Sequence, residues 1–293
     1  MAQDSDTVEE ARTAFKARAT AIEDVQIQPA GFLVELSLDW IVLRASENVD
    51  EYLGESHVTL IEEPFSRFVQ AQALHDLRNL FSRLSGSTGI ARAYRVRLTD
   101  DRPRLDIAFQ VRDNRVLIEG TASPERGFGQ ALGSVGGLVE GLAGIAGKAL
   151  LDGAARRVRA LTGFDSASIL CGDRSAQSSR GSFGPAADSI ADLPAIVADI
   201  AAAPIPVFPR KPADSAIRHA LLRSPPAETL QKLREQGIGS AMSVPLSFEG
   251  ERLGAVECHS RAARTPNFEL HAATELFGQL LALRLEVDRL RAN

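Results

Sequence analysis

Residues 132–151 read LGSVGGLVEGLAGIAGKALL, an apolar segment that is nearly long enough to cross a lipid bilayer. Small residues recur in it at the four-residue spacing of packed membrane helices, at Gly133, Gly137 and Gly141. Glu140 lies near the middle, however, where a charged group costs about 2.5–3.5 kcal/mol in a membrane helix, and Lys148 lies near the end. We therefore expect a soluble segment and no membrane span.

The length of the chain, 293 residues, exceeds what one hydrophobic core usually organises, so two domains are expected. Hydrophobic residues make up 44% and charged residues 24%, a balance that lets each domain bury a core. We place the first domain at residues 22–123, after an N-terminal extension at 1–21, and the second at 148–293. Residues 124–147 are the expected linker, flexible at its glycines and helical from about Ile145.

The charge and the cysteine content exclude several classes of function. A net charge of −5 provides no basic surface for phosphate neutralisation, so direct binding of nucleic acid is not expected. Cys171, Cys258 and five scattered histidines give no metal-ligand spacing and no disulfide framework. With no charged-then-apolar leader at Met1, the sequence predicts a cytoplasmic protein.

Alternation of apolar and polar residues indicates strands in the N-terminal half. A hairpin is expected over residues 32–36 and 40–45, and three further strands over 94–99, 105–111 and 116–119. A helix over residues 65–84 separates the two groups. A strand pair, short helices and a three-strand antiparallel run are the layout of a PAS domain.

The C-terminal half predicts its own α+β domain of GAF type. We expect helices over residues 148–161 and 187–202, a strand over 166–171, and a hairpin formed by 241–248 and 253–259. The overall class is thus α+β, with a PAS domain followed by a GAF domain, each an antiparallel sheet flanked by helices.

A long helix is expected to end the chain, over residues 268–290. Within it apolar residues step by four and three, the seam of a two-helix coiled coil: Leu276, Leu280, Leu283, Val287 and Leu290. The helix either packs on the GAF sheet alone or forms a homodimer. We favour the dimer because the seam runs to the last residues of the chain.

Several strings in order resemble the photosensory PAS–GAF module of bacterial phytochromes. In the PAS half they are IQPAG at residues 27–31, ASEN at 45–48 and ALHDLR at 73–78. In the GAF half they are ADLP at 191–194, LRS at 222–224, LREQG at 233–237 and the pair CH at 258–259. The resemblance covers about residues 22–290.

This resemblance implies a GAF pocket for a linear tetrapyrrole such as biliverdin. Arg223 matches an arginine that grips a propionate, Ser243 a pocket hydroxyl, and His259 the histidine that bonds a ring carbonyl. Asp192, Leu193 and Pro194 match the end of a motif near the pyrrole nitrogens, and Thr229 stands at the second pocket histidine.

The sequence departs from the family at the attachment sites and in the pocket lining. No cysteine precedes the PAS domain, and Glu228 stands where plant-type members carry theirs, so we expect no covalent bilin. Apolar groups or a lysine replace pocket tyrosines at Leu170, Ala201 and Lys232. The sequence leaves two alternatives open: a noncovalently bound bilin, or a pocket filled by side chains.

We also expect the family's loop around the N-terminal segment to be reduced or absent, because the chain between residues 200 and 223 is short for this family.

No phosphate-binding glycine loop, zinc-protease helix motif or hydrolase elbow occurs, so catalysis is not expected. The predicted function is a phytochrome-like sensory regulator that relays a signal through its C-terminal helix, with a histidine kinase or another signalling protein as partner. The alternative is a bilin-free module that dimerises and regulates a partner.

Overall fold

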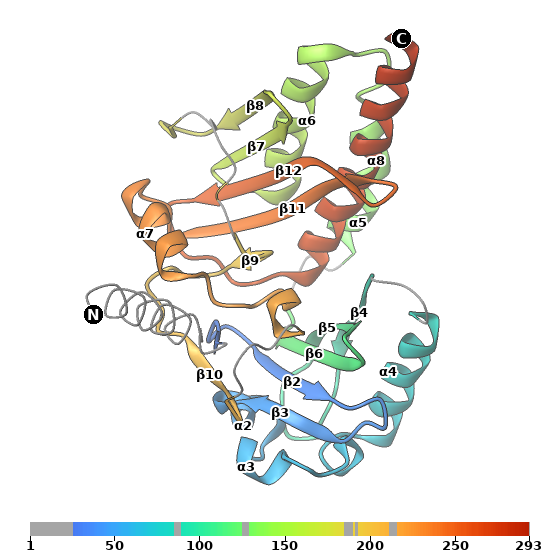
Figure 1. Cartoon of the computed structure of the whole chain (residues 1–293), viewed down its shortest axis with the longest axis vertical. Helices are drawn as coiled ribbons and strands as arrows, with labels where there is room; N and C mark the ends of the chain where they lie inside the picture. The colour runs from blue at the N-terminus through green and yellow to red at the C-terminus, as the bar shows by residue number, and fades with distance from the viewer. Residues whose placement is uncertain are drawn as a thin grey trace, which may run out of the picture.

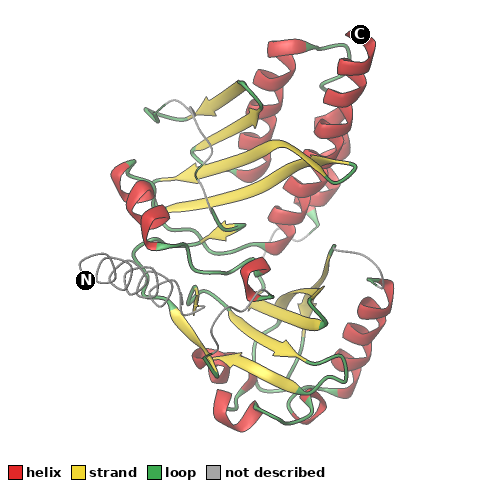
Figure 2. Cartoon of the chain, viewed as in Figure 1, coloured by secondary structure: helices red, strands yellow, loops and turns green. Residues whose placement is uncertain are grey.

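The computed structural model describes residues 26–84, 89–124, 129–184, 190, 193–210 and 216–292. The chain forms two lobes, each built on one antiparallel sheet with helices packed against it (Figures 1 and 2). The fold class and the order of the two predicted domains are confirmed.

The sheet of the N-terminal lobe has the strand order β1-β10-β3-β2-β6-β5-β4. Five of its strands correspond to predicted ones: β2 (Phe32–Leu36), β3 (Val42–Ser46), β4 (Ile90–Val96), β5 (Leu105–Arg112) and β6 (Arg115–Ala122). The strand predicted over residues 94–99 was placed too late, because β4 begins at Ile90 and ends at Val96. Successive side chains of a strand point to opposite faces of the sheet, so alternate residues of β2 and β5 lie on different faces. Phe32, Val34, Ile107 and Phe109 lie in the core of this lobe, whereas Leu33 and Ala108 point to the other face.

Short helices cover the core face of this sheet: η1 (Glu47–Val49), α2 (Asp50–Leu53), α3 (His57–Leu60), η2 (Phe65–Arg67) and α4 (Ala71–Arg83). The single helix predicted over residues 65–84 is in fact two helices, η2 and α4, and the longer one begins only at Ala71. Residue Gln70 has extended backbone angles, and its amide donates to the Leu98 carbonyl, which separates η2 from α4. Leu74 and Leu77 bury one side of α4 against the sheet.

Two strands of this sheet, β1 (Gln26–Ile27) and β10 (Ile205–Phe208), were not predicted. Strand β10 pairs with β3 on one side, where Val207 lies opposite Ser46, and with β1 on the other, although these strands are far apart in the sequence. The C-terminal half thus contributes a strand to the N-terminal sheet.

The N-terminal segment, residues 26–28, lies between β10 and residues 216–224, a segment that we call the arm. The Ser224 amide donates to the Gln26 carbonyl and the Gln28 amide to the Leu222 carbonyl, each at 2.9 Å. The Gln28 side chain also bonds the Ile196 carbonyl and the Ala198 amide. Residues 26–28 thus have backbone partners on two sides. The expectation of a reduced or absent loop around the N-terminal segment stays a prediction, because residues 211–215 and the chain before Gln26 lie outside the described residues.

The GAF sheet has the order β8-β7-β12-β11-β9. Its strands are β7 (Ser166–Cys171), β8 (Arg174–Ser179), β9 (Ile196–Val197), β11 (Ser240–Phe248) and β12 (Glu251–Ser260). The helices α5 (Gln130–Glu140), α6 (Gly147–Thr162) and α8 (Phe268–Ala292) lie together along it (Figure 1). Phe277 and Leu281 of α8 enter the main GAF core with Leu150 and Val158 of α6. The remaining helices are η3 (Ile217–His219) in the arm and α7 (Ala227–Glu235).

Helix α5 corrects the expectation of a flexible linker. Val135 is buried against α8, and the α5 glycines have open space around them. The buried Glu269 carboxylate of α8 accepts hydrogen bonds from the Gly129 amide at 2.9 Å and the Ala131 amide at 3.2 Å. A carboxylate at a helix N-terminus satisfies amides that have no partner within the helix, so α5 forms despite its glycines.

The prediction of a helix over residues 187–202 is also wrong for residues 193–202, most of the part of that range that the structure describes. Ile196 and Val197 form β9 and pair with Met242 and Ala241 of β11. Pro194 cannot donate a backbone hydrogen bond, and β-branched residues suit a strand edge better than a helix. Throughout the described residues, no helix combines the length and apolar content needed to cross a membrane.

Candidate functional site

The GAF sheet has one apolar and one polar face. Met242, Val244, Val256 and Cys258 point toward the helices in the main core. The opposite face carries two cross-strand rows, Ala241–His259–Ser166 and Ser243–Glu257–Ser168. Polar side chains on a buried sheet face are unusual because each needs a hydrogen-bond partner, so this face is the candidate site.

His259 and Glu257 are the ionisable groups at the centre of this face. His259 is 9% exposed and Glu257 2% exposed, and the His259 Nε2 atom lies 3.8 Å from a Glu257 carboxylate oxygen. Burial lowers the pKa of His259 to about 4, so its ring is neutral at physiological pH. Its Nε2 atom is buried and makes no hydrogen bond, an arrangement that suits a ligand with a polar atom.

The other predicted site residues come from segments that border this face. Thr229 is buried in the first turn of α7, four residues before the buried Leu233. Arg223 is half-buried in the arm, where it forms an isolated bridge with Ile27. Leu193 packs partly against this side of the sheet and Pro194 is buried, whereas Asp192 lies outside the described residues.

An apolar cluster packs against the same face of the sheet. It consists of Ile190, Val197, Leu233, Ile238 and Ala241, with Leu193 and Ile200 at its edge. A tetrapyrrole with two propionates needs paired cations and hydrogen-bond donors, because an unpaired buried charge costs several kcal/mol. The buried His259 nitrogen fits such a ligand, but this cluster does not.

A cavity of about 110 Å³ borders this cluster at Val197 and Ala241 and lies between β9, β11 and the start of α8. Its lining includes Phe164, Ala198, Met242 and Asn267, and Arg264, whose guanidinium stacks on Phe164 at 4.3 Å. None of the six predicted pocket residues that the structure describes lines this cavity.

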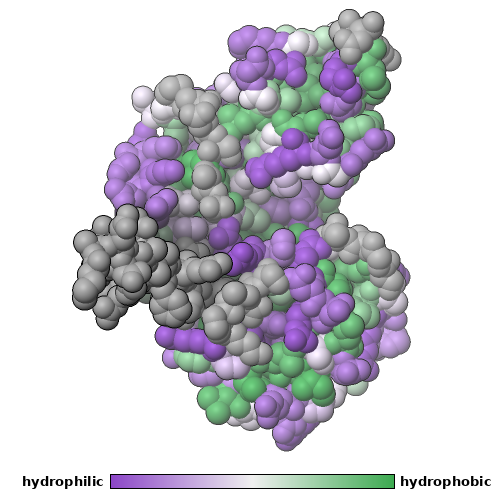
Figure 3. Space-filling model, viewed as in Figure 1, coloured by the Kyte–Doolittle hydropathy of each residue, from purple (hydrophilic) through white to green (hydrophobic). Residues whose placement is uncertain are grey.

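The C-terminal helix α8 packs on the GAF lobe and leaves three leucines of the predicted seam exposed. Ala273, Phe277 and Leu281 are buried in the main GAF core, so the helix packs on the GAF sheet. Leu276, Leu283 and Leu290 are 40%, 47% and 65% exposed and recur every seven residues. Leu280 and Val287 are half-buried beside them. In Figure 3, hydrophobic surface reaches the upper right edge of the view, near the C-terminal end of the chain.

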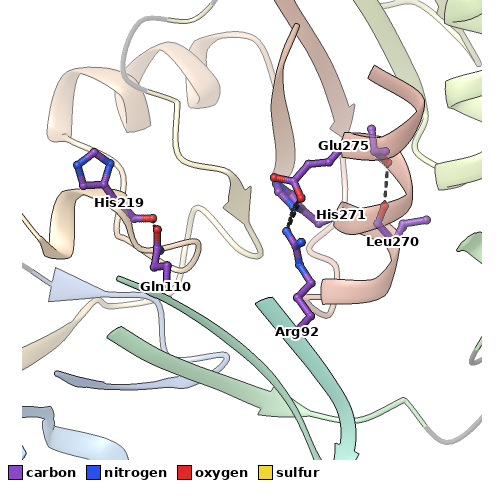
Figure 4. Close-up of polar contacts among 7 residues, drawn as sticks. Arg92, Gln110, His219, Leu270, His271 and Glu275 are labelled. Carbon is purple, nitrogen blue, oxygen red and sulfur yellow. Dashed lines mark hydrogen bonds and ion pairs between the residues drawn. The ribbon is translucent and has the colours of Figure 1, made fainter. Parts of the chain in front are cut away.

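The start of α8 also contacts the N-terminal lobe. An Nη atom of Arg92, on β4, lies 3.0 Å from His271 Nδ1 and 2.6 Å from a Glu275 carboxylate oxygen (Figure 4). Burial lowers the pKa of His271 to about 4, so Nδ1 of the neutral ring accepts this hydrogen bond. The N-terminal sheet is therefore joined directly to the helix that ends the chain.

Sequence reasoning missed Glu257, Arg92 and the buried Glu119 on β6. The alternation in β12 could have revealed Glu257, because it places residues 257 and 259 on one face. Arg92 and Glu119 have no local signal, since their partners lie more than 100 residues away in the chain.

Comparison with known proteins agrees with this architecture. Residues 21–119 match the family described as PAS fold, and residues 147–287 match the GAF domain. The chromophore-binding domain of an unusual bacteriophytochrome from R. palustris superposes with a TM-score of 0.75 at 24% identity, over 93% of this chain and 97% of that one.

Two structures from Stigmatella aurantiaca are similarly close. The chromophore-binding domain of phytochrome P1 gives a TM-score of 0.74 at 23% identity, covering 90% of this chain and 98% of that one. The longer photosensory core module gives a TM-score of 0.74 at 22% identity, and the match covers 90% of this chain and 58% of that one. The chain is therefore a PAS–GAF protein with the fold of a bacteriophytochrome chromophore-binding domain.

Proposed function

We propose that this protein is a noncatalytic, cytoplasmic sensory regulator of phytochrome type that passes a signal from its PAS–GAF core to a partner through α8. The observation that carries the proposal is the position of α8. One side packs on the GAF sheet, its first turns bind Arg92 of the PAS sheet, and its leucines at 276, 283 and 290 remain exposed. A change in either lobe therefore acts on this helix.

The exposed stripe supports a homodimer, in which a second copy of α8 covers it. Apolar residues at a seven-residue spacing pack in pairs along two helices. A signalling partner such as a histidine kinase would then be arranged by the geometry of the dimer.

The substitution Leu283→Glu is expected to convert the dimer into a monomer, because it places two carboxylates in the centre of the shared apolar seam. Size-exclusion chromatography with light scattering gives the mass before and after the change. The matched control is Val58→Glu, which alters an isolated apolar residue that is 73% exposed on the PAS lobe and leaves the mass unchanged. A wild-type monomer at high micromolar concentration contradicts the dimer.

We further propose that no bilin is attached covalently. Cys171 and Cys258 are both buried, on β7 and β12, and burial raises the pKa of the Cys258 thiol to about 12, which keeps it from forming a reactive thiolate. If biliverdin binds noncovalently, Arg223, Ser243, Thr229 and His259 are the residues that would hold it, with Asp192, Leu193 and Pro194 at the pyrrole nitrogens.

An absorption spectrum of the protein co-produced with a haem oxygenase tests the light-sensing form of this function. A red band that shifts on illumination and is lost on denaturing gel filtration supports a noncovalent photoreceptor. A band that stays with the denatured chain contradicts the noncovalent assignment. His259→Ala is the matched variant, because it removes the unpartnered buried nitrogen and is expected to shift or abolish the band.

The second candidate is a bilin-free interaction module, favoured by the apolar cluster against the polar face of the sheet. A colourless protein that still dimerises through α8 selects this function. A colourless protein that is also monomeric contradicts both.

A further inference from the structure

The outer face of the PAS sheet turns three polar side chains toward the GAF lobe, one from each of three adjacent strands. Arg92 on β4 binds the start of α8, and Gln110 on β5 donates to the His219 carbonyl at 2.7 Å (Figure 4). Glu119 on β6 accepts hydrogen bonds from the amides of Leu221 and Leu222 at 2.9 and 2.8 Å. Gln110 and Glu119 therefore bind the arm, the segment that also holds residues 26–28.

Glu119 is unusual among these contacts because it is a carboxyl group with 1% exposure. Within the described residues, no lysine, arginine or histidine nitrogen lies within 4 Å of its oxygens, so no ion pair offsets its burial. Burial raises its pKa to about 7, although the two amide bonds and the charge of Arg92 act in the opposite direction.

Other charged and titratable groups face Glu119 or the arm. Arg92, whose charge acts on Glu119, is held by His271 and Glu275. Burial lowers the pKa of His271 to about 4 and, with nearby arginines, lowers the pKa of His219 in the arm. The other charged groups that act on this part of the arm are Arg112, Asp113, Arg218 and Arg223.

We propose that Glu119 is a proton-dependent clasp between the PAS sheet and the arm, and that the clasp loosens when the carboxyl group ionises. Because the Leu222 carbonyl accepts from the Gln28 amide, loosening the arm also weakens its hold on residues 26–28. The inference does not depend on whether the GAF pocket holds a ligand.

The direction of the effect follows from proton linkage. When the arm opens, Glu119 meets water and ionises near its ordinary pKa of 4.5, whereas in the closed state it keeps its proton up to about pH 7. Between these values the open state binds fewer protons, so opening becomes easier as pH rises. Above pH 7 both states are ionised and the dependence ends. From pH 5 to pH 8 the opening equilibrium is expected to rise on the order of 100-fold.

Amide hydrogen exchange of the full chain tests the clasp. Peptides covering residues 216–224 are followed from pH 5 to pH 8, and each rate is divided by its intrinsic exchange rate. We expect the corrected opening to rise with pH in the wild type and to be flat in Glu119→Gln, which cannot ionise. A flat wild-type profile, or the same slope in the variant, overturns the proposal.

Gln110→Ala is the matched control, because it removes a neighbouring bond to the arm without removing a titrating group. It is expected to increase opening at every pH and to keep the slope; a lost slope in this variant would contradict the assignment to Glu119. If Glu119→Gln does not fold, carboxyl carbon NMR of the wild type decides. A glutamate that titrates near pH 7 and is perturbed in Gln110→Ala supports the clasp, and glutamates that all titrate below pH 5.5 overturn it.

Discussion

We expect the substitution Arg44→Ala to lower the free energy of unfolding by about 3 kcal/mol. Arg44 is 1% exposed on β3, its Nη1 atom lies 3.6 Å from a carboxylate oxygen of Glu35, and its Nε donates to the Pro209 carbonyl at 2.9 Å. Removing the guanidinium leaves the Glu35 carboxylate, 3% exposed, with a weaker charge partner, and breaks a bond between the PAS sheet and the segment after β10. Urea unfolding followed by fluorescence measures the loss, since Trp40 is the single tryptophan and is buried in this lobe.

Two further variants separate the charge from the packing. Arg115 also pairs with Glu35, at 3.4 Å, but it is 43% exposed, so Arg115→Ala is expected to cost less than about 1 kcal/mol. The double variant Glu35→Gln with Arg44→Met removes both charges and is expected to recover part of the loss. If Arg44→Ala and Arg115→Ala cost the same, burial of the ion pair is not the cause.

Gly254→Ala is expected to destabilise the GAF lobe by about 3 kcal/mol, at the upper end of typical overpacking costs. Gly254 lies on β12 opposite Cys171 of β7, and a methyl group on it would overlap the backbone carbonyl oxygen of Leu170. A backbone atom in a central strand pair cannot move aside as a side chain can, so the strands must separate. Circular dichroism during thermal unfolding reports the lowered midpoint.

The control for this substitution is Gly136→Ala in α5. An added methyl group there has open space, and alanine favours the helix over glycine by about 0.5–1 kcal/mol. The same change of residue is therefore expected to stabilise one element and destabilise the other. A loss of stability in both variants would contradict the packing argument.

The sequence predicted those elements whose signal is local. Alternation located β2 and β5, short apolar runs located β7, β11 and β12, and the spacing of apolar residues indicated the seam on α8. Helix α5 was missed because glycines lower the intrinsic preference for a helix, while the Glu269 carboxylate that caps it comes from 137 or more residues away. Strand β10 was missed because it is four residues long and pairs with strands from the other half of the chain.

The candidate site was predicted less completely for the same reason. His259 and Ser243 could be placed on adjacent strands from their alternation, and the structure pairs β11 with β12. Arg223 lies in the arm, whose position depends on contacts with the PAS sheet rather than on local pattern. Thr229 lies in α7, whose Leu233 packs with Val197 of β9 and Ala241 of β11. The apolar cluster that packs on the face of the sheet bearing His259 draws on two separate segments, residues 190–200 and 233–241, and only the folded chain shows that they meet.

The strand that crosses from one half of the chain into the sheet of the other has a consequence for synthesis on the ribosome. A nascent chain that has emerged only to residue 124 has made β2 to β6, but lacks β10 and the arm that cover β3 and the outer face of the sheet. The N-terminal lobe can therefore complete its fold only after residue 224 has emerged. For the same reason, separating the halves within residues 124–147 would give an N-terminal product with an open sheet edge and uncovered Leu33 and Leu117, a surface prone to aggregation.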